Sequence, residues 1–425
     1  MKLFSLRLTT LKSKLYAIVF ASFVVRVVAF FMLPNNESPL GPDEGNYGEL
    51  TEWIAQGKPA DKYPYSFLYI ISRTLIVPAS ILHNSLGITG LNAVRIISSL
   101  YGFLTLCLAV YFFRKAADQR QDFSKWVSNN QAWVILLFMV FTFMPSHSIW
   151  SYLGLRDAAM EFWVLVVFVL IFFIFEANQN PSKLCFLGIL VGIPLVFSSR
   201  PQVGWVLGIT VLVFSLIKFK SSAAKILIPL TLIGIISGYV VTTPPGTIIS
   251  PSATLITQAG ASLITQADAI PLRQELNKID AASAIKTLAC PITTEPRLQK
   301  YACIAYRAPY TTYTFLVRPQ LGADVTSSSS LFAAIENTLW LGAFLFVILM
   351  LIRNRRLAFF GALAPSLLFF SIYSVAAGAY EGNMGTAFRH KSLILWVVLL
   401  LIASTIVATQ QRKAEQQGIP GSSQE

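Results

Sequence analysis

Two neighbouring carboxylates follow the first long apolar stretch of the chain. Asp43 and Glu44 stand in the segment Gly-Pro-Asp-Glu-Gly-Asn-Tyr-Gly-Glu, residues 41–49. A carboxylate whose direction is fixed can take a proton from an attacking hydroxyl group, which is general-base chemistry. The same residues could instead cap a helix, because acidic side chains favour its N-terminal end. A capping position also fixes the direction of a carboxylate, so the two interpretations are compatible.

A second set of residues suited to chemistry is basic and occupies three short turns between apolar stretches. The set consists of Arg156, Arg200 and the run Arg389-His390-Lys391. Arginine stays charged at any relevant pH, and its planar fork can donate two hydrogen bonds to one phosphate group. These turns are therefore candidates for a phosphate site, with Arg200 and Arg389 the strongest. Contact with lipid headgroups or pairing with nearby carboxylates such as Glu381 is the structural alternative.

Asp157 follows Arg156 and offers a further acidic group for catalysis. Its structural alternatives are a helix-start pattern with Glu161, four residues later, or a salt bridge to Arg156. The sequence leaves these possibilities open.

The elements that position these residues must be membrane helices. Of 425 residues, 55% are hydrophobic and only 12% are charged, whereas a soluble domain carries about 25% charged residues. A membrane helix needs roughly 20 apolar residues. We therefore expect an all-α polytopic bundle of about ten spans. They lie at 15–33, 96–113, 132–144 (running on through Trp150), 159–175, 184–199, 203–217, 226–242, 331–352, 357–377 and 392–409.

Basic residues in short loops mark the cytoplasmic side of a membrane protein. Starting from an inner N-terminus, the basic segments fall at every second loop, at 2–14, 114–125, 183, 218–225, 353–356 and 412–413. Both termini are therefore expected in the cytoplasm, and the three basic turns described above fall on the outer side. The net charge of +13 reflects topology and anionic lipid headgroups, and we do not expect nucleic-acid binding.

Two longer segments are expected outside the membrane. The first outer loop covers 34–92 within a transmembrane module of 1–242, and an outer domain covers 243–330. Residues 331–425 complete the chain with further spans and a cytoplasmic tail. Cys290 and Cys303 fall in the outer domain, where an oxidising compartment permits a disulfide.

Arg26 interrupts the first span. A long cationic side chain can extend along the helix to the membrane surface, which is the first expectation here. Pairing with a carboxylate or a lipid phosphate inside the membrane is the alternative.

The order of motifs in the first 220 residues resembles the GT-C superfamily of lipid-phosphosugar-dependent glycosyltransferases, particularly protein O-mannosyltransferases and the aminoarabinose transferase of lipid A. The resemblance rests on one span followed by Asp43-Glu44-x-x-Tyr47, Trp53-Ile54-Ala55-Gln56-Gly57, Tyr63-Pro64, Asn92-Ala93-Val94-Arg95, Leu155-Arg156-Asp157 and Ser199-Arg200-Pro201. Beyond residue 243, the outer segment and the run Gly385–Lys391 resemble bacterial polysaccharide-assembly proteins. The resemblance therefore implies a multi-pass protein of a bacterial inner or plasma membrane.

The resemblance implies transfer of a sugar from a polyprenyl-phosphate donor, with inversion, to a glycan, lipid or protein acceptor on the outer face. Asp43 is then the expected base. Glu44 would orient Asp43, hold the acceptor or bind a divalent cation, and Asp157 would be a further catalytic carboxylate. Tyr47, Arg156, Arg200, Arg389, His390 and Lys391 are the expected substrate-binding residues.

Two other functions are compatible with many membrane spans. A polysaccharide polymerase or ligase would take a pyrophosphate-linked glycan. A transporter or flippase of lipid-linked sugars would show inverted repeats and paired broken helices, and neither pattern is evident in the sequence.

Overall fold

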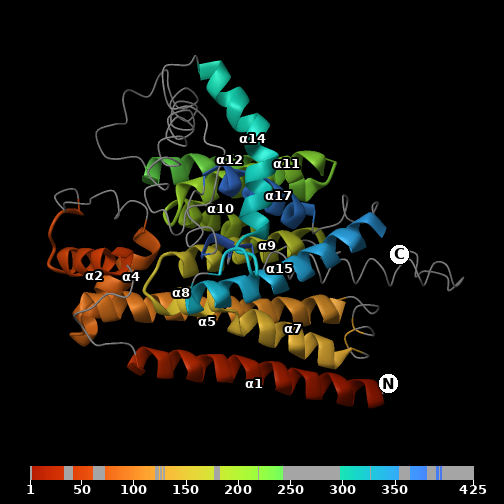
Figure 1. Ribbon diagram of the computed structural model, residues 1–425, viewed down its shortest axis with the longest axis horizontal. Coiled ribbons are helices and arrows are strands. Elements are labelled where there is room, and N and C mark those ends of the chain that lie inside the picture. Colours follow the sequence, from red (N-terminus) through yellow and green to blue (C-terminus); the bar gives the residue numbers. More distant parts are fainter. Residues whose placement is uncertain are drawn as a thin grey trace, which may run out of the picture.

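A computed structural model describes most of the chain (Figure 1). The description covers residues 2–32, 42–60, 72–119, 124, 127, 130–176, 182–218, 220–242, 297–325, 327–353, 364–380, 389–391 and 393–394. Within these residues every regular element is a helix and no strand occurs. The all-α fold expected from the sequence is confirmed.

Four of the described helices are long and apolar enough to cross a membrane: α1 (Lys2–Met32), α5 (Gly90–Gln119), α9 (Asp157–Glu176) and α12 (Ser222–Thr242). Shorter apolar stretches make up α7 (Gln131–Phe143), α10 (Lys183–Phe197) and α11 (Pro201–Ile217), and two more lie at Ser330–Phe346 within α15 (Ser328–Arg353) and at Pro365–Ala379 within α17 (Ala364–Tyr380). Together they match the first nine expected spans in order, four long and five short. The chain is a polytopic membrane protein. The tenth expected span, 392–409, lies almost wholly outside the described residues.

The third expected span does not continue as one helix to Trp150. α7 ends at Phe143, Met144 has an extended backbone, and a separate helix, α8 (Pro145–Tyr152), begins at Pro145. Proline disfavours helical backbone in the residue before it and fits the first position of a new helix. The break therefore has a local cause in the sequence.

Helices α5 and α9 run in the same direction, as their places in the expected topology require. The ring of Tyr101 packs against Phe162, and further along the same two helices Phe112 packs against Phe172. From the first pair to the second, the residue number rises by a similar amount in both helices. The N-terminal ends of the two helices therefore lie at the same end of the bundle.

The N-terminal end of α5 is covered by α2 (Pro42–Ala55) and α4 (Arg73–Leu86), which enclose a small apolar core of their own. α4 has 14 residues and is about 21 Å long, too short to cross a hydrocarbon layer of about 30 Å. α2 approaches α5 so closely that a Cβ atom at Gly90 would overlap the Gly48 carbonyl oxygen. This contact and the hydrogen bond from the Gly90 amide to the Glu52 side chain, 2.7 Å, fix the position of α2.

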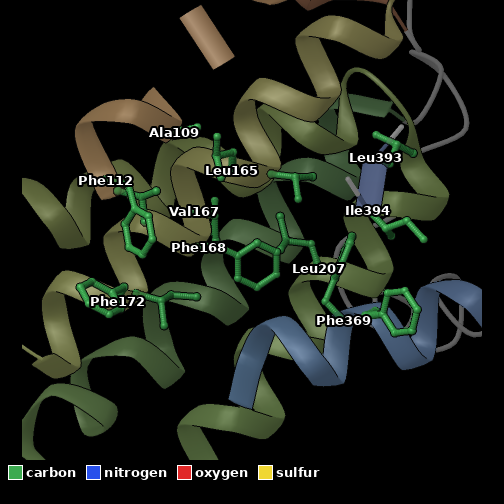
Figure 2. Close-up of a cluster of buried hydrophobic side chains, with 14 of the residues drawn as sticks. Ala109, Phe112, Leu165, Val167, Phe168, Phe172, Leu207, Phe369, Leu393 and Ile394 are labelled. Atoms are coloured by element: carbon green, nitrogen blue, oxygen red, sulfur yellow. The ribbon is translucent and has the colours of Figure 1, made fainter. Parts of the chain in front are cut away.

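The main apolar core joins α5, α9, α11 and α17, and Figure 2 shows part of it. Phe168 of α9 packs edge-to-face on Phe369 of α17, with ring centroids 5.3 Å apart. Leu393 and Ile394 are each 1% exposed and belong to the same core. The core therefore anchors the chain immediately after Arg389-His390-Lys391.

α14 (Arg297–Val317) crosses the direction of α1, α5 and α9 in Figure 1. The C-terminal half of α14 packs against α17, where Phe315 is 1% exposed. The rest of the expected outer domain, residues 243–296, lies outside the described residues.

We predict that the α2 end of the bundle faces outward. Gln56 follows α2, and Lys115 lies 25 residues beyond Gly90 on α5, which places it about 38 Å along the helix axis. Both side chains are exposed. With Cys107 and Cys185 replaced by alanine, Gln56→Cys should react with an impermeant maleimide in intact cells and Lys115→Cys only after permeabilisation. Labelling of Lys115→Cys from outside would show that the orientation is inverted.

Candidate active site

A buried carboxylate, Asp157, lies between two guanidinium groups at the α2 end of the bundle. Asp157 begins α9 and is 2% exposed. Arg389 donates from Nε to Oδ2 of Asp157 over 2.5 Å and places a terminal nitrogen on the same oxygen. Nη2 of Arg200 lies 3.4 Å from Oδ1. The arrangement joins the start of α9, the residue before α11 and the segment 389–391.

Asp43 supplies a second carboxylate to the same cluster, and this one is accessible. Asp43 lies in the first turn of α2, and its side chain is 47% exposed. Arg389 donates from Nη1 to Oδ2 of Asp43 over 3.3 Å. One guanidinium group therefore bridges a buried carboxylate and an accessible one.

His390 contacts Arg200 on the other side of the cluster. Nη1 of Arg200 lies within hydrogen-bond distance of Nε2 of His390. Arginine can only donate, so Nε2 must accept, and the ring proton belongs on Nδ1. The hydroxyl group of Tyr373 donates to the His390 carbonyl oxygen over 3.2 Å, which fixes the backbone at this point.

Arg156 and Tyr47 complete the electrostatics of the site. Burial and, to a smaller extent, the neighbouring Arg200 and Arg389 lower the pKa of Arg156. Burial raises the pKa of Tyr47, so its phenol keeps its proton and remains a hydrogen-bond donor. Three arginines face two aspartates, and the local charge is therefore suited to an additional anion.

The structure thus brings together most of the residues that the sequence singled out: Asp43, Tyr47, Arg156, Asp157, Arg200, Arg389 and His390. They come from four parts of the chain separated by up to 346 positions.

Glu44 does not share the site with Asp43. Its side chain is 0% exposed and accepts from Nε of Arg95 on α5 over 2.6 Å. A carboxylate enclosed in this way cannot hold an acceptor or a cation at the accessible cluster. The remaining interpretation is that Glu44 fixes α2, and with it the direction of Asp43.

Lys391 also points away from the cluster, which corrects the expectation that it binds substrate. Its ammonium group donates to the carbonyl oxygens of Leu316 and Arg318 and to the side-chain oxygen of Asn337. These acceptors lie at the C-terminal end of α14 and on α15. Lys391 is 2% exposed and has no access to a ligand at Asp43.

Arg26 does not extend to the membrane surface, because polar partners surround it inside the bundle. It is 4% exposed and donates to Ser22 and Ser151. It also lies 3.4 Å from Nε2 of His147, whose Nδ1 lies 3.0 Å from Glu161. Arg26 is therefore paired inside the bundle, with the His147 imidazole lying between the Arg26 guanidinium group and the Glu161 carboxylate.

Sequence reasoning missed a polar contact beside Arg200. The hydroxyl groups of Thr74 on α4 and Ser199 lie 2.5 Å apart. Single Thr and Ser residues at the ends of helices are too frequent to signal such a pair.

One of the two cysteines of the expected disulfide lies within the described residues. Cys303 is disulfide-bonded and Cys107 and Cys185 are free, while Cys290 lies outside the described residues. In the described part of the chain, no three His, Cys, Asp or Glu side chains are grouped to hold a metal ion.

Comparison with known proteins adds a weak similarity to a solved structure. No protein-family model matches the chain, and no curated protein sequence matches it. Among solved structures, the chain is similar to ArnT from Cupriavidus metallidurans bound to undecaprenyl phosphate, at 13% identity and a TM-score of 0.39. The match covers 93% of this chain and 79% of that protein. A similarity this weak establishes neither fold nor function for this chain.

We predict that Glu44→Ala destabilises the protein strongly, because it leaves the Arg95 charge buried without its carboxylate. Removing one partner of a buried ion pair typically costs about 3–5 kcal/mol. Gln56→Ala, an exposed change immediately after the same helix, should change stability by less than about 0.5 kcal/mol. Thermal unfolding of both variants in detergent measures the difference. Equal melting temperatures would show that the Glu44–Arg95 pair does not hold α2 in place.

Proposed function

We propose that this protein is an integral membrane glycosyltransferase. It transfers a sugar from a polyprenyl-phosphate donor to an acceptor hydroxyl group on the outer face of the membrane. The observation that carries the proposal is the bridge that Arg389 makes between buried Asp157 and accessible Asp43. The motifs shared with the GT-C superfamily support it independently.

The arginines supply a site for the donor phosphate. A carrier whose tail lies in the bilayer presents its phosphate at the ends of the spans, which is where Arg156, Arg200 and Arg389 gather. Asp157 holds two of these guanidinium groups in fixed directions. Fixed cations stabilise the phosphate more strongly as it gains negative charge on departure, and this lowers the barrier to transfer.

Asp43 is the base, because it is the accessible carboxylate of the cluster. The acceptor oxygen forms a bond to the anomeric carbon as the bond from that carbon to the phosphate oxygen breaks. The bonding electrons leave with the phosphate, and the acceptor proton passes to Asp43. Attack from the face opposite the phosphate inverts the anomeric carbon. Asp157 is buried and pairs with arginines, so its role is to orient them.

Arg389 links donor binding to the availability of the Asp43 carboxylate as a base. In the described structure its guanidinium group contacts Asp43 at 3.3 Å, longer than its contact with Asp157. A donor phosphate can accept two hydrogen bonds from an arginine fork, whereas Asp43 holds Arg389 by the single 3.3 Å contact. Binding of the donor therefore draws Arg389 from Asp43, and the freed carboxylate can accept a hydrogen bond from the acceptor hydroxyl group.

The first test is a donor panel with wild-type protein and Asp43→Asn. Radiolabelled polyprenyl monophosphate sugars should lose label with the wild type. Asp43→Asn should be slower by about 10²–10⁴-fold, the usual effect of losing a general base, without a rise in donor KM. Glu49→Gln, on the exposed side of α2, is the matched control. Near-normal transfer by Asp43→Asn would remove Asp43 as the base, and turnover of a pyrophosphate-linked glycan alone would favour a polymerase or ligase.

A second prediction concerns the phosphate site. Arg389→Ala and Arg200→Ala should each reduce kcat by roughly 10²–10³-fold, as for loss of one donor to a developing charge. Lysine at either position should recover only part of the rate, because an ammonium group lacks the planar fork. Lys58→Ala removes an exposed cation near the end of α2 and should leave transfer unchanged. Wild-type kinetics from both folded alanine variants would place the phosphate elsewhere.

A further inference from the structure

Three consecutive residues, Arg389, His390 and Lys391, bind three different parts of the molecule. Arg389 contacts Asp157 and Asp43, His390 contacts Arg200, and Lys391 contacts α14 and α15. We propose that Lys391 is a positioning residue whose bonds to α14 and α15 hold Arg389 and His390 in the catalytic arrangement. The site is then fully assembled only while the end of α14 is docked. This inference rests on the proposed function.

The contacts of Lys391 account for all of its donors. A lysine ammonium group has three N–H bonds. They are directed at the carbonyl oxygen of Leu316, at 3.2 Å, the carbonyl oxygen of Arg318 and Oδ1 of Asn337. Asn337 in turn donates to the carbonyl oxygens of Val317 and Pro319. Lys391 and Asn337 together satisfy the carbonyl groups of the last two residues of α14, Leu316 and Val317, which have no partner within the helix, and those of the next two residues, Arg318 and Pro319.

A second connection runs from α14 to the same segment through α17. The ring of Phe315 packs edge-to-face on Tyr373, with centroids 6.4 Å apart, and the Tyr373 hydroxyl group donates to the His390 carbonyl oxygen. α14 lies so close to α17 that a Cβ atom at Gly378 would be 2.7 Å from Cα of Thr312. Movement of the end of α14 must therefore disturb both connections.

The segment 389–391 cannot absorb such a movement by bending. Leu393 and Ile394 are held in the main core, and Lys391 is only two residues from Arg389. A displacement of Lys391 by about 1 Å therefore reaches Arg389 and His390, and misplacement of that size can cost on the order of 10²-fold in rate.

The charge of Lys391 gives the connection a pH dependence. Burial lowers the pKa of Lys391 to about 7, and Glu336 on α15 acts in the opposite direction. The groups that surround the Lys391 ammonium group are the carbonyl oxygens and the Phe315 ring at the end of α14, and Asn337 and Glu336 on α15. The nearby Arg318 side chain is paired with Asp324. The neutral amine has two N–H bonds for three acceptors. One bond is therefore lost as the pH rises through the pKa of Lys391.

The test compares Lys391→Met and Glu336→Gln with a control, Thr314→Val. Thr314 is buried on the same part of α14, and its hydroxyl group donates to Thr311 within that helix. Transfer is measured from about pH 6 to about pH 9. Lys391→Met should lower kcat roughly tenfold or more at all pH values and abolish the alkaline decline that Lys391 causes. Glu336→Gln should keep the acidic plateau and move the decline to lower pH, while Thr314→Val should behave as wild type.

Hydrogen–deuterium exchange separates this inference from the proposed function. In Lys391→Met the amides of residues 314–318 and 389–391 should exchange faster than in wild type and Thr314→Val, whatever the protein transfers. If the wild type transfers no lipid-linked sugar but this exchange pattern is found, the proposed glycosyltransferase function is wrong and the positioning of residues 389–391 by Lys391 is still supported. Unchanged exchange in Lys391→Met, or an alkaline limb that Glu336→Gln does not move, would overturn the role of Lys391.

Discussion

The pairing of Asp157 with Arg200 and Arg389 is the interaction on which the arrangement of the site depends. Asp157 is almost fully buried, and a buried carboxylate is costly unless cations and hydrogen bonds compensate it. The compensation comes from two residues distant in sequence. Since neither arginine can leave without exposing a buried charge to an apolar surrounding, the start of α9, the start of α11 and the segment 389–391 must stay together.

The sequence predicted the spans and the meeting of the basic turns because both follow from simple constraints. A run of apolar residues must cross the membrane as a helix to satisfy its backbone, and alternating spans bring every second turn to the same side. Asp43, Asp157, Arg200 and Arg389 were therefore expected at one surface, and the structure places them in direct contact. Which carboxylate contacts which arginine depends on how the helices pack, and the local order of residues in the sequence does not determine that packing.

Two of the expected site residues that the structure places outside the cluster are neighbours in sequence of residues that it places inside. Glu44 follows Asp43, but successive helical residues point about 100° apart, so one carboxylate faces the accessible cluster while the other meets Arg95. Lys391 is separated from Arg389 by one residue and turns toward α14 in the same way. Arg26 was misplaced for another reason. The partners that make its burial tolerable, His147 and Ser151, come from α8, which only the fold brings near.

α9 connects two polar networks at different depths, and its sequence shows why it can do so in a membrane. Asp157 and Glu161 are four residues apart and lie on the same face, one turn from each other. Asp157 pairs with arginines at the end of the bundle, whereas Glu161 pairs deeper inside with His147 and, beyond it, Arg26. Among the four long apolar helices of the described chain, α9 is the most buried. Its charged face is therefore shielded from lipid along both turns. Asp157 pairs with Arg200 and Arg389, and Glu161 pairs with the His147 imidazole that also contacts Arg26. The same residues that would be unfavourable in a lone span therefore hold α1, α8 and the start of α11 around α9.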